Sequence, residues 1–179
     1  MKVAILGVSG IGSFLVREVG ECFTKKMLDQ KNITFTIFDP EIVERDDYIT
    51  QNYDPDNIGE RKVNVLWNAF PEDHRRALNR KKKLPAYTTS FNGFDLIVLC
   101  IENENLERYA LSYVLRDKEV RGFIKASNGI TDSLYDAKLS AISTCKRILD
   151  YYGQRLSDLE NPIRPEETGN DGRGIEAGS

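Results

Sequence analysis

The chain has 179 residues, of which 40% are hydrophobic and 30% charged, and its formal net charge is −3. This length and composition fit one globular domain with a hydrophobic core, and no apolar run is long enough to span a bilayer. The small negative charge excludes a general attraction to nucleic acids or anionic membranes. Three scattered cysteines without a CxxC pair argue against a zinc site and a disulfide framework. We therefore expect a cytoplasmic protein.

The chain opens with a strand, a glycine-rich turn and a helix. A continuous apolar run over residues 2–6 predicts a buried parallel strand, and helical spacing of apolar residues predicts a helix from about 11 to about 30. β-Branched and aromatic residues then predict a second strand over residues 33–38, which ends at Asp39. A glycine-rich turn between a strand and a helix is typical of a nucleotide-binding βα unit.

Each part of this turn has a chemical reason. Gly7 permits the tight turn, Gly10 lets the backbone approach phosphate oxygens, and Gly12 lets the helix pack closely on the strand. The free N–H groups at the start of the helix favour an anion. Asp39 can accept hydrogen bonds from ribose hydroxyls, which suits ATP or NAD and opposes NADP. The alternatives are a nucleotide-free glycine turn and a solvated loop acid.

The remaining elements alternate in type. Residues 41–57 predict short helical turns, Gly59 opens a helix, and residues 71–84 are highly charged. Next come a weak strand pattern over 85–91, a strongly buried strand over 94–101, a helix over 104–116, a strand over 120–126 and a helix from 132 to about 152. This alternation predicts an α/β protein with a Rossmann-like, doubly wound, mainly parallel sheet. We expect a domain over 1–152 and a flexible tail over 153–179.

A basic run and the cysteines have plain structural interpretations. The basic side chains over residues 74–83 lack interleaved aromatic residues, so we favour a solvated charged face or a mobile connection over a nucleic-acid surface. Cys22 and Cys100 are expected to be core thiols. Cys145 has no obvious neighbouring base and is not nominated as a nucleophile.

Residues beyond the turn carry a resemblance to a known family. In order, the chain offers the turn Gly7–Ser13, the acid motif Asp39–Val43, then Asp47, Thr50 and Gln51, the lysine motif Asn57–Lys62, and a buried strand followed by Glu102 and Asn103. This series resembles the superfamily of ThiF, MoeB and the ubiquitin-activating enzymes over residues 1 to about 128. The chain looks short relative to full ThiF-like domains.

The resemblance implies an activity and a set of site residues. The family joins AMP from ATP, with Mg²⁺, to the C-terminal carboxylate of a small ubiquitin-like or sulfur-carrier protein. Lys62 would offset phosphate charge, Gln51 would act beside the nucleotide, and Glu102 would hold the metal. Asn103 would contact the nucleotide or simply cap the following helix. The nucleotide-binding set that the resemblance implies is Gly7, Ser9, Gly10, Gly12, Ser13, Asp39, Glu41, Lys62 and Asn103.

The sequence also departs from the family pattern. Thr50 stands where the family has an arginine, and Asp47 stands where it has an asparagine. These changes predict weak or absent adenylation by this chain alone, and leave open whether it is an enzyme or the partner subunit of one, in a homodimer or heterodimer. An NAD-binding oxidoreductase or sensor, and a catalytically inactive assembly module of the same fold, are the alternative functions.

Overall fold

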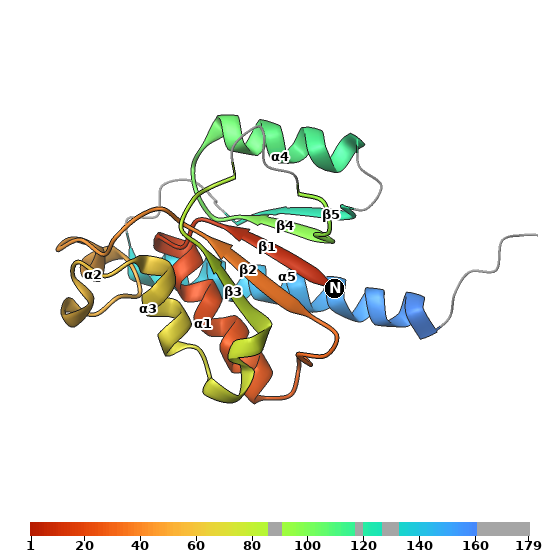
Figure 1. Cartoon of the computed structure of the whole chain (residues 1–179), viewed down its shortest axis with the longest axis horizontal. Coiled ribbons are helices and arrows are strands. Elements are labelled where there is room, and N and C mark those ends of the chain that lie inside the picture. Colours follow the sequence, from red (N-terminus) through yellow and green to blue (C-terminus); the bar gives the residue numbers. More distant parts are fainter. Residues whose placement is uncertain (86–90, 117–119, 127–132, 161–179) are drawn as a thin grey trace, which may run out of the picture.

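The architecture is a parallel sheet with helices on both faces. The computed structural model describes residues 1–85, 91–116, 120–126 and 133–160. Within these residues, five strands form one sheet in the order β3-β2-β1-β4-β5, and every neighbouring pair is parallel (Figure 1). The strands are β1 (Lys2–Leu6), β2 (Thr34–Phe38), β3 (Leu78–Lys81), β4 (Leu96–Leu99) and β5 (Gly122–Lys125).

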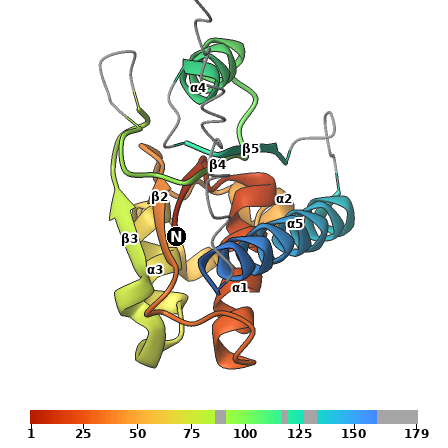
Figure 2. The same ribbon diagram turned by 90° about the vertical axis from the view of Figure 1, so that its right-hand side faces the viewer.

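The helices divide unequally between the two faces. Figure 2 shows α4 on one side of the sheet, and α1, α3 and the long α5 on the other. The α-helices are α1 (Gly10–Thr24), α2 (Asp47–Thr50), α3 (Lys62–Ala69), α4 (Glu104–Arg116) and α5 (Leu134–Glu160), with 3₁₀ turns at Pro55–Asn57 and Glu72–Ala77. Helices on both faces of a parallel sheet make this the Rossmann-like, doubly wound α/β fold expected from the sequence.

The central strands are buried on both faces, as their continuous apolar character predicts. In β1, Val3 and Ile5 pack into the larger core beneath α1, α3 and α5, whereas Ala4 and Leu6 pack into the smaller core beneath α4. This alternation follows from the two-residue period of a strand. Because β1, β2 and β4 are parallel neighbours, their carboxyl ends lie at the same end of the sheet, where the loops of the candidate site begin.

Two helix boundaries differ from the sequence expectation. The first helix ends at Thr24 rather than near residue 30, and Lys26 adopts a left-handed backbone conformation with φ of 58°. The chain then turns so that Leu28, which is 4% exposed, enters the core. At the other end, α5 continues past Tyr152 to Glu160, so residues 153–160 are helical where a flexible tail was expected. Residues 161–179 lie outside the described part of the chain.

The charged segment over 71–84 contains a strand that the sequence analysis missed. Strand β3 pairs with β2 at the edge of the sheet, and it has one buried residue, Leu78, followed by three exposed polar residues. The Arg80 guanidinium lies 4.1 Å from the ring centroid of Trp67 on α3. Charged side chains on an edge strand discourage pairing with another chain. The basic run over 74–83 thus spans the end of a 3₁₀ turn and an exposed edge strand, and it is a charged face rather than a mobile connection. The strand expected over 85–91 falls largely outside the described residues.

The cysteines are buried, as expected for Cys22 and Cys100. Burial raises the pKa of the Cys100 thiol to about 12. Cys22 on α1 and Cys145 on α5 place their sulfur atoms 3.6 Å apart, and burial raises the pKa of both thiols. Such protonated thiols are poor nucleophiles, and they help α5 to pack on α1. Within the described ranges, no helix combines the length and the apolar character that crossing a lipid bilayer requires.

Candidate nucleotide site at the first βα corner

The glycine turn has the tight geometry that its residues suggest. Gly7 has φ of +87°, and a Cβ atom on it would lie 2.8 Å from the Cβ of Ile101 at the end of β4. A Cβ atom on Gly12 would collide with the carbonyl oxygen of Gly7. At Gly10, by contrast, nothing lies within 4 Å of the Cβ position. The turn is therefore packed tightly on its core side and open at Gly10.

Asp39 fastens this turn to the end of β2. Its side chain is 1% exposed, and its two carboxylate oxygens accept the backbone N–H groups of Val8 and Glu41, each at 2.8 Å. Burial raises the pKa of Asp39, although the two N–H groups work against that rise by favouring the ionised form. The carboxylate thus holds backbone together, and Asp39 is not among the residues that line the cleft described below. Its contact with a ribose stays a prediction.

A second clamp comes from the segment after α2. Ser13 is fully buried, its hydroxyl donates to the Gly10 carbonyl oxygen at 2.7 Å, and it accepts the Asn52 N–H at 3.0 Å. The Tyr53 hydroxyl donates to the Val8 carbonyl oxygen at 2.6 Å, and burial raises the pKa of this phenol. These bonds give Ser13 a structural task. Together these hydrogen bonds hold the turn on its core side, whereas its other side is open at Gly10.

Lys62 brings positive charge to the open side of the turn. It begins α3, its side chain is 3% exposed, and its ammonium nitrogen lies 2.7 Å from Glu41 Oε2, 3.2 Å from Asp47 Oδ2 and 3.2 Å from Ser9 Oγ. The Ser9 hydroxyl also donates to Glu41 Oε2 at 3.0 Å. The Lys62 ammonium lowers the pKa of Glu41 by hydrogen bonding and by its charge. A buried cation, a hydroxyl and two acids therefore meet beside the glycine turn.

Asp47 is held firmly in this cluster. Its carboxylate accepts the Glu44 N–H at 2.7 Å and the Gln51 side-chain amide at 2.5 Å, and it forms an ion pair with Lys62. The remaining amide oxygen of Gln51 is buried without a hydrogen-bond partner. Thr50, where the resembling family has an arginine, is exposed at the end of α2. Asp47, which stands where the resembling family has an asparagine, thus forms an ion pair with Lys62.

These groups line a cleft of about 690 Å³ at the carboxyl ends of β1, β2 and β4. Helix α1 follows β1 onto one face and α4 follows β4 onto the other, so the cleft lies at the switch point where such folds bind ligands. Its size is typical of small-molecule sites. The lining residues are Ser9, Pro40, Glu41, Ile42, Glu44, Asp47, Gln51, Lys62, Ile101 and Glu102.

The charge of the cleft is predominantly acidic. Glu41, Glu44, Asp47 and Glu102 face one lysine among the lining residues. Asn103 is not part of the lining, and its side-chain oxygen instead accepts the Leu106 N–H at 2.9 Å at the start of α4. Its helix-capping alternative is therefore what the structure shows. No group of three or more potential metal ligands occurs within the described residues. Most ligands of a metal at Glu102 would therefore be oxygen atoms of water or of a bound ligand.

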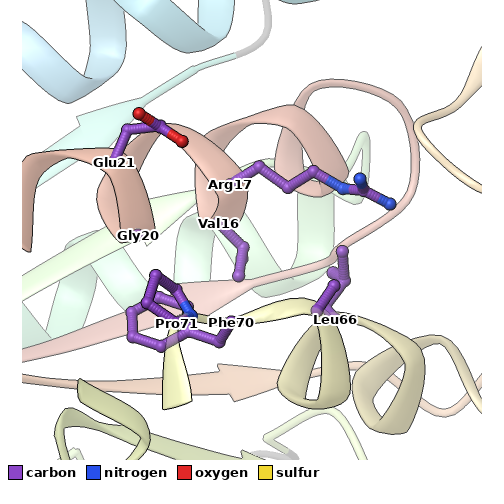
Figure 3. A pocket seen from close by; sticks show the side chains of 8 residues that line it. Val16, Arg17, Gly20, Glu21, Leu66, Phe70 and Pro71 are labelled. Atoms are coloured by element: carbon purple, nitrogen blue, oxygen red, sulfur yellow. The ribbon is translucent and has the colours of Figure 1, made fainter. Parts of the chain in front are cut away.

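A second, smaller cavity of about 150 Å³ lies between α1 and α3 (Figure 3). Gly20 faces Pro71 there, and a Cβ atom on Gly20 would lie 2.9 Å from the proline ring. Arg17 extends along this cavity and donates to the Asn52 carbonyl oxygen at 3.1 Å. Apolar residues line this cavity together with Arg17 and Glu21, and none of the cleft residues lines it. Gly20 thus allows the segment that follows α3 to approach α1 closely.

The chain thus has a Rossmann-like, doubly wound α/β fold with a cleft at the switch point of its parallel sheet. No family model matches the chain, and no curated protein matches it in sequence. Among solved structures, the chain is similar to E. coli TcdA, a tRNA N6-threonylcarbamoyladenosine dehydratase, with a TM-score of 0.58 and 14% identity over 73% of this chain and 54% of that chain. It is also similar to E. coli MccB with MccA-N7isoASN, with a TM-score of 0.68 and 13% identity over 86% of this chain and 57% of that chain.

Structures of both proteins with nucleotide are among the matches. TcdA in complex with ATP gives a TM-score of 0.59 at 14% identity, and MccB with ATP gives 0.68 at 14% identity. In each case this chain spans less than two thirds of the other chain, at 53% and 56%. At such low identity the likeness establishes the fold, and activity and partners are matters for proposal.

Proposed function

We propose that the chain binds ATP in the cleft at the first βα corner and acts in adenylation, as an adenylyltransferase or as the partner subunit of one. The main observation in favour of this proposal is that Lys62, Ser9 and the open Gly10 lie together at the start of α1. An ammonium group, a hydroxyl group and the free N–H groups of a helix are suitable donors for phosphoryl oxygens. The ATP complexes of structural neighbours support the choice of nucleotide.

The chemistry assigns a role to each group. A C-terminal carboxylate of a small ubiquitin-like protein, sulfur carrier or peptide attacks the α-phosphorus of ATP, and pyrophosphate leaves. Lys62 offsets charge on the leaving phosphates, and Glu102, which lines the cleft, would supply an oxygen ligand to a Mg²⁺ ion that accompanies the phosphates. Gln51 lies on the same wall with an unpaired amide oxygen that can accept a hydrogen bond from the nucleotide. Glu41, which reaches the cleft, is better placed than buried Asp39 to contact the ribose. The proposed setting is the cytoplasm.

One observation favours the partner-subunit form of this proposal. The ammonium of Lys62 is already neutralised by Glu41 and Asp47, and further carboxylates line the cleft. Charged clamps on the phosphates contribute much of the rate of phosphoryl transfer. We therefore expect nucleotide binding to be easier to detect than turnover, and turnover to need a second chain that supplies cations.

A binding titration tests the proposal directly. The chain is titrated with ATP and Mg²⁺ by calorimetry, and Lys62→Met is expected to weaken binding by about 10-fold or more, as the loss of a charged phosphate contact does. Lys25→Met is the matched control, because Lys25 lies at the far end of α1 and pairs with exposed Glu21. It should bind ATP as the unmodified chain does.

The same preparation distinguishes the competing functions. ATP–pyrophosphate exchange with candidate carrier proteins, with and without candidate partner chains, reports adenylation. Competition by NAD for the ATP site would favour an oxidoreductase or sensor instead. If no nucleotide binds, or if Lys62→Met binds ATP as tightly as Lys25→Met, the proposed site is wrong.

A further inference from the structure

Three groups surround the ammonium nitrogen of Lys62 in this structure. Glu41 and Ser9 accept hydrogen bonds from two of its three N–H donors, and Asp47 Oδ2 pairs with its charge at 3.2 Å. A phosphoryl oxygen that takes the hydrogen bond now held by Glu41 must therefore displace Glu41.

The two acids differ in how firmly they are held. The Asp47 side chain is 13% exposed, and its carboxylate also accepts the Glu44 N–H and the Gln51 amide. The Glu41 side chain is 52% exposed, and the hydrogen bonds described for its carboxylate come from Lys62 and Ser9, both inside the cleft. Glu41 can thus rotate away from Lys62 while it stays at the mouth of the cleft, whereas Asp47 cannot move without breaking hydrogen bonds to its own loop.

The donors that hold Glu41 are those that would hold a phosphate. Its Oε2 atom accepts from the Ser9 hydroxyl at 3.0 Å and from the Lys62 ammonium at 2.7 Å. Ser9 immediately precedes α1, whose first N–H groups lack partners within the helix. A carboxylate resembles a phosphoryl group in carrying negative charge on acceptor oxygens.

We propose that Glu41 is an internal occupant of the phosphate position, and that it sets the affinity and selectivity of the cleft for phosphoryl ligands by competing with them. The proposal rests on the proposed function for the identity of the ligand as a nucleotide polyphosphate. A ligand must displace Glu41, so only chains in which Glu41 has turned away from Lys62 can bind it. The apparent affinity of the ligand is the intrinsic affinity multiplied by the fraction of such chains. Once displaced, Glu41 remains on the cleft wall, where its carboxylate is available to ribose hydroxyls. Nucleotides are thereby favoured over simple phosphates.

The experiment uses inorganic tripolyphosphate, which has the phosphates of ATP but no ribose. Binding to the full chain is measured by calorimetry without divalent cations. Glu41→Gln and Glu41→Ala are expected to bind tripolyphosphate about 3- to 10-fold more tightly than the unmodified chain, with the larger gain for alanine. Thermal melting of each variant checks that it is folded.

Glu44→Gln is the matched control. Glu44 lines the same cleft, and this substitution removes the same charge, but the Glu44 side chain is not one of the groups that contact Lys62. Its gain should be less than half that of Glu41→Gln. An equal gain would show that general charge repulsion governs binding, and unchanged or weaker binding by the Glu41 variants would show that Glu41 does not compete. Either result overturns the proposal.

A parallel titration with ATP and Mg²⁺ separates this proposal from the proposed function. If ATP binds but tripolyphosphate affinity is the same in all variants, the role of Glu41 is refuted and nucleotide binding stands. If the Glu41 variants gain affinity but no preparation gives ATP–pyrophosphate exchange, the competition by Glu41 stands and adenylation fails. If neither ligand binds to any variant, both proposals are overturned.

Discussion

The core side and the cleft side of the first βα corner use the same residue types for opposite purposes. On the core side, Asp39 and Ser13 are buried and bond to the backbone of the turn. On the cleft side, Glu41 and Ser9 bond to each other and to Lys62. The pKa of Asp39 is raised by burial, whereas the pKa of Glu41 is lowered by Lys62.

The difference shows that, for these two acids, burial decides whether the carboxylate holds the scaffold or faces the cleft. A buried carboxylate must be satisfied by fixed donors, so it becomes part of the scaffold. A half-exposed carboxylate can exchange its partners with water or with a ligand at little cost. Core-side substitutions should therefore change stability, and cleft-side substitutions should change binding.

Substitution of Gly12 and of Gly10 should give the largest contrast between the core side and the cleft side. Gly12→Ala should lower the free energy of unfolding by about 2–4 kcal/mol, because its Cβ would collide with the Gly7 carbonyl oxygen. Gly10→Ala should change it by less than about 0.5 kcal/mol, because that Cβ would enter open space. Chemical denaturation of both variants measures the contrast. Equal losses would contradict a packed side and an open side.

The two acids give the next largest contrast. Asp39→Ala should lower the free energy of unfolding by about 2 kcal/mol, because the Val8 and Glu41 N–H groups lose their acceptors. Glu41→Ala should cost less than about 1 kcal/mol, since its ion pair is half exposed. Urea denaturation measures both. Asp39→Asn, which keeps the shape but offers one acceptor oxygen, should fall between them, and a loss from Glu41→Ala as large as that from Asp39→Ala would refute this account.

The sequence predicts the core of this fold well because its buried strands are continuous apolar runs. Strands β1 and β4 and helix α4 occur where those patterns place them. Strand β3 escapes prediction because only Leu78 of its four residues is buried, so an edge strand looks like a charged connection. The end of α1 escapes prediction because the chain turns at Lys26 and then buries Leu28 in the core. In the sequence, an apolar residue at this position looks like a further turn of the same helix.

The candidate site is predictable in its parts but not in its contacts. The glycine turn follows from local sequence, and Lys62 was found through the family resemblance. The pairing of Lys62 with Glu41 depends on an isolated antiparallel bridge between Ile42 and Arg61, which sets residues 41 and 62 side by side. The segment between them has no regular periodicity, so nothing in the sequence signals that bridge. Likewise, no local sequence pattern reveals that the Asp39 carboxylate accepts backbone N–H groups whereas the Glu41 carboxylate pairs with Lys62.

The smallest expected effect is a pH dependence of opposite sign for the two acids. The pKa of Glu41 is lower in the folded chain than its ordinary value of 4.5, so its contribution to stability is present above that pH. It is lost as the pH falls through the folded pKa. The thermal midpoint of the unmodified chain should therefore exceed that of Glu41→Gln at pH 7, by an amount equivalent to roughly 0.5 kcal/mol after solvent screening, and the gap should close as the pH falls below 4.5.

For Asp39 the pKa is higher in the folded chain than its ordinary value of 3.8, so ionisation costs stability as the pH rises from that value through the folded pKa. Measured against Asp39→Asn over the same range, the unmodified chain should gain relative stability as the pH falls, whereas it loses relative stability against Glu41→Gln. Two curves of the same sign would mean that the two acids experience similar surroundings. The division of this corner into a scaffold side and a ligand side would then be wrong.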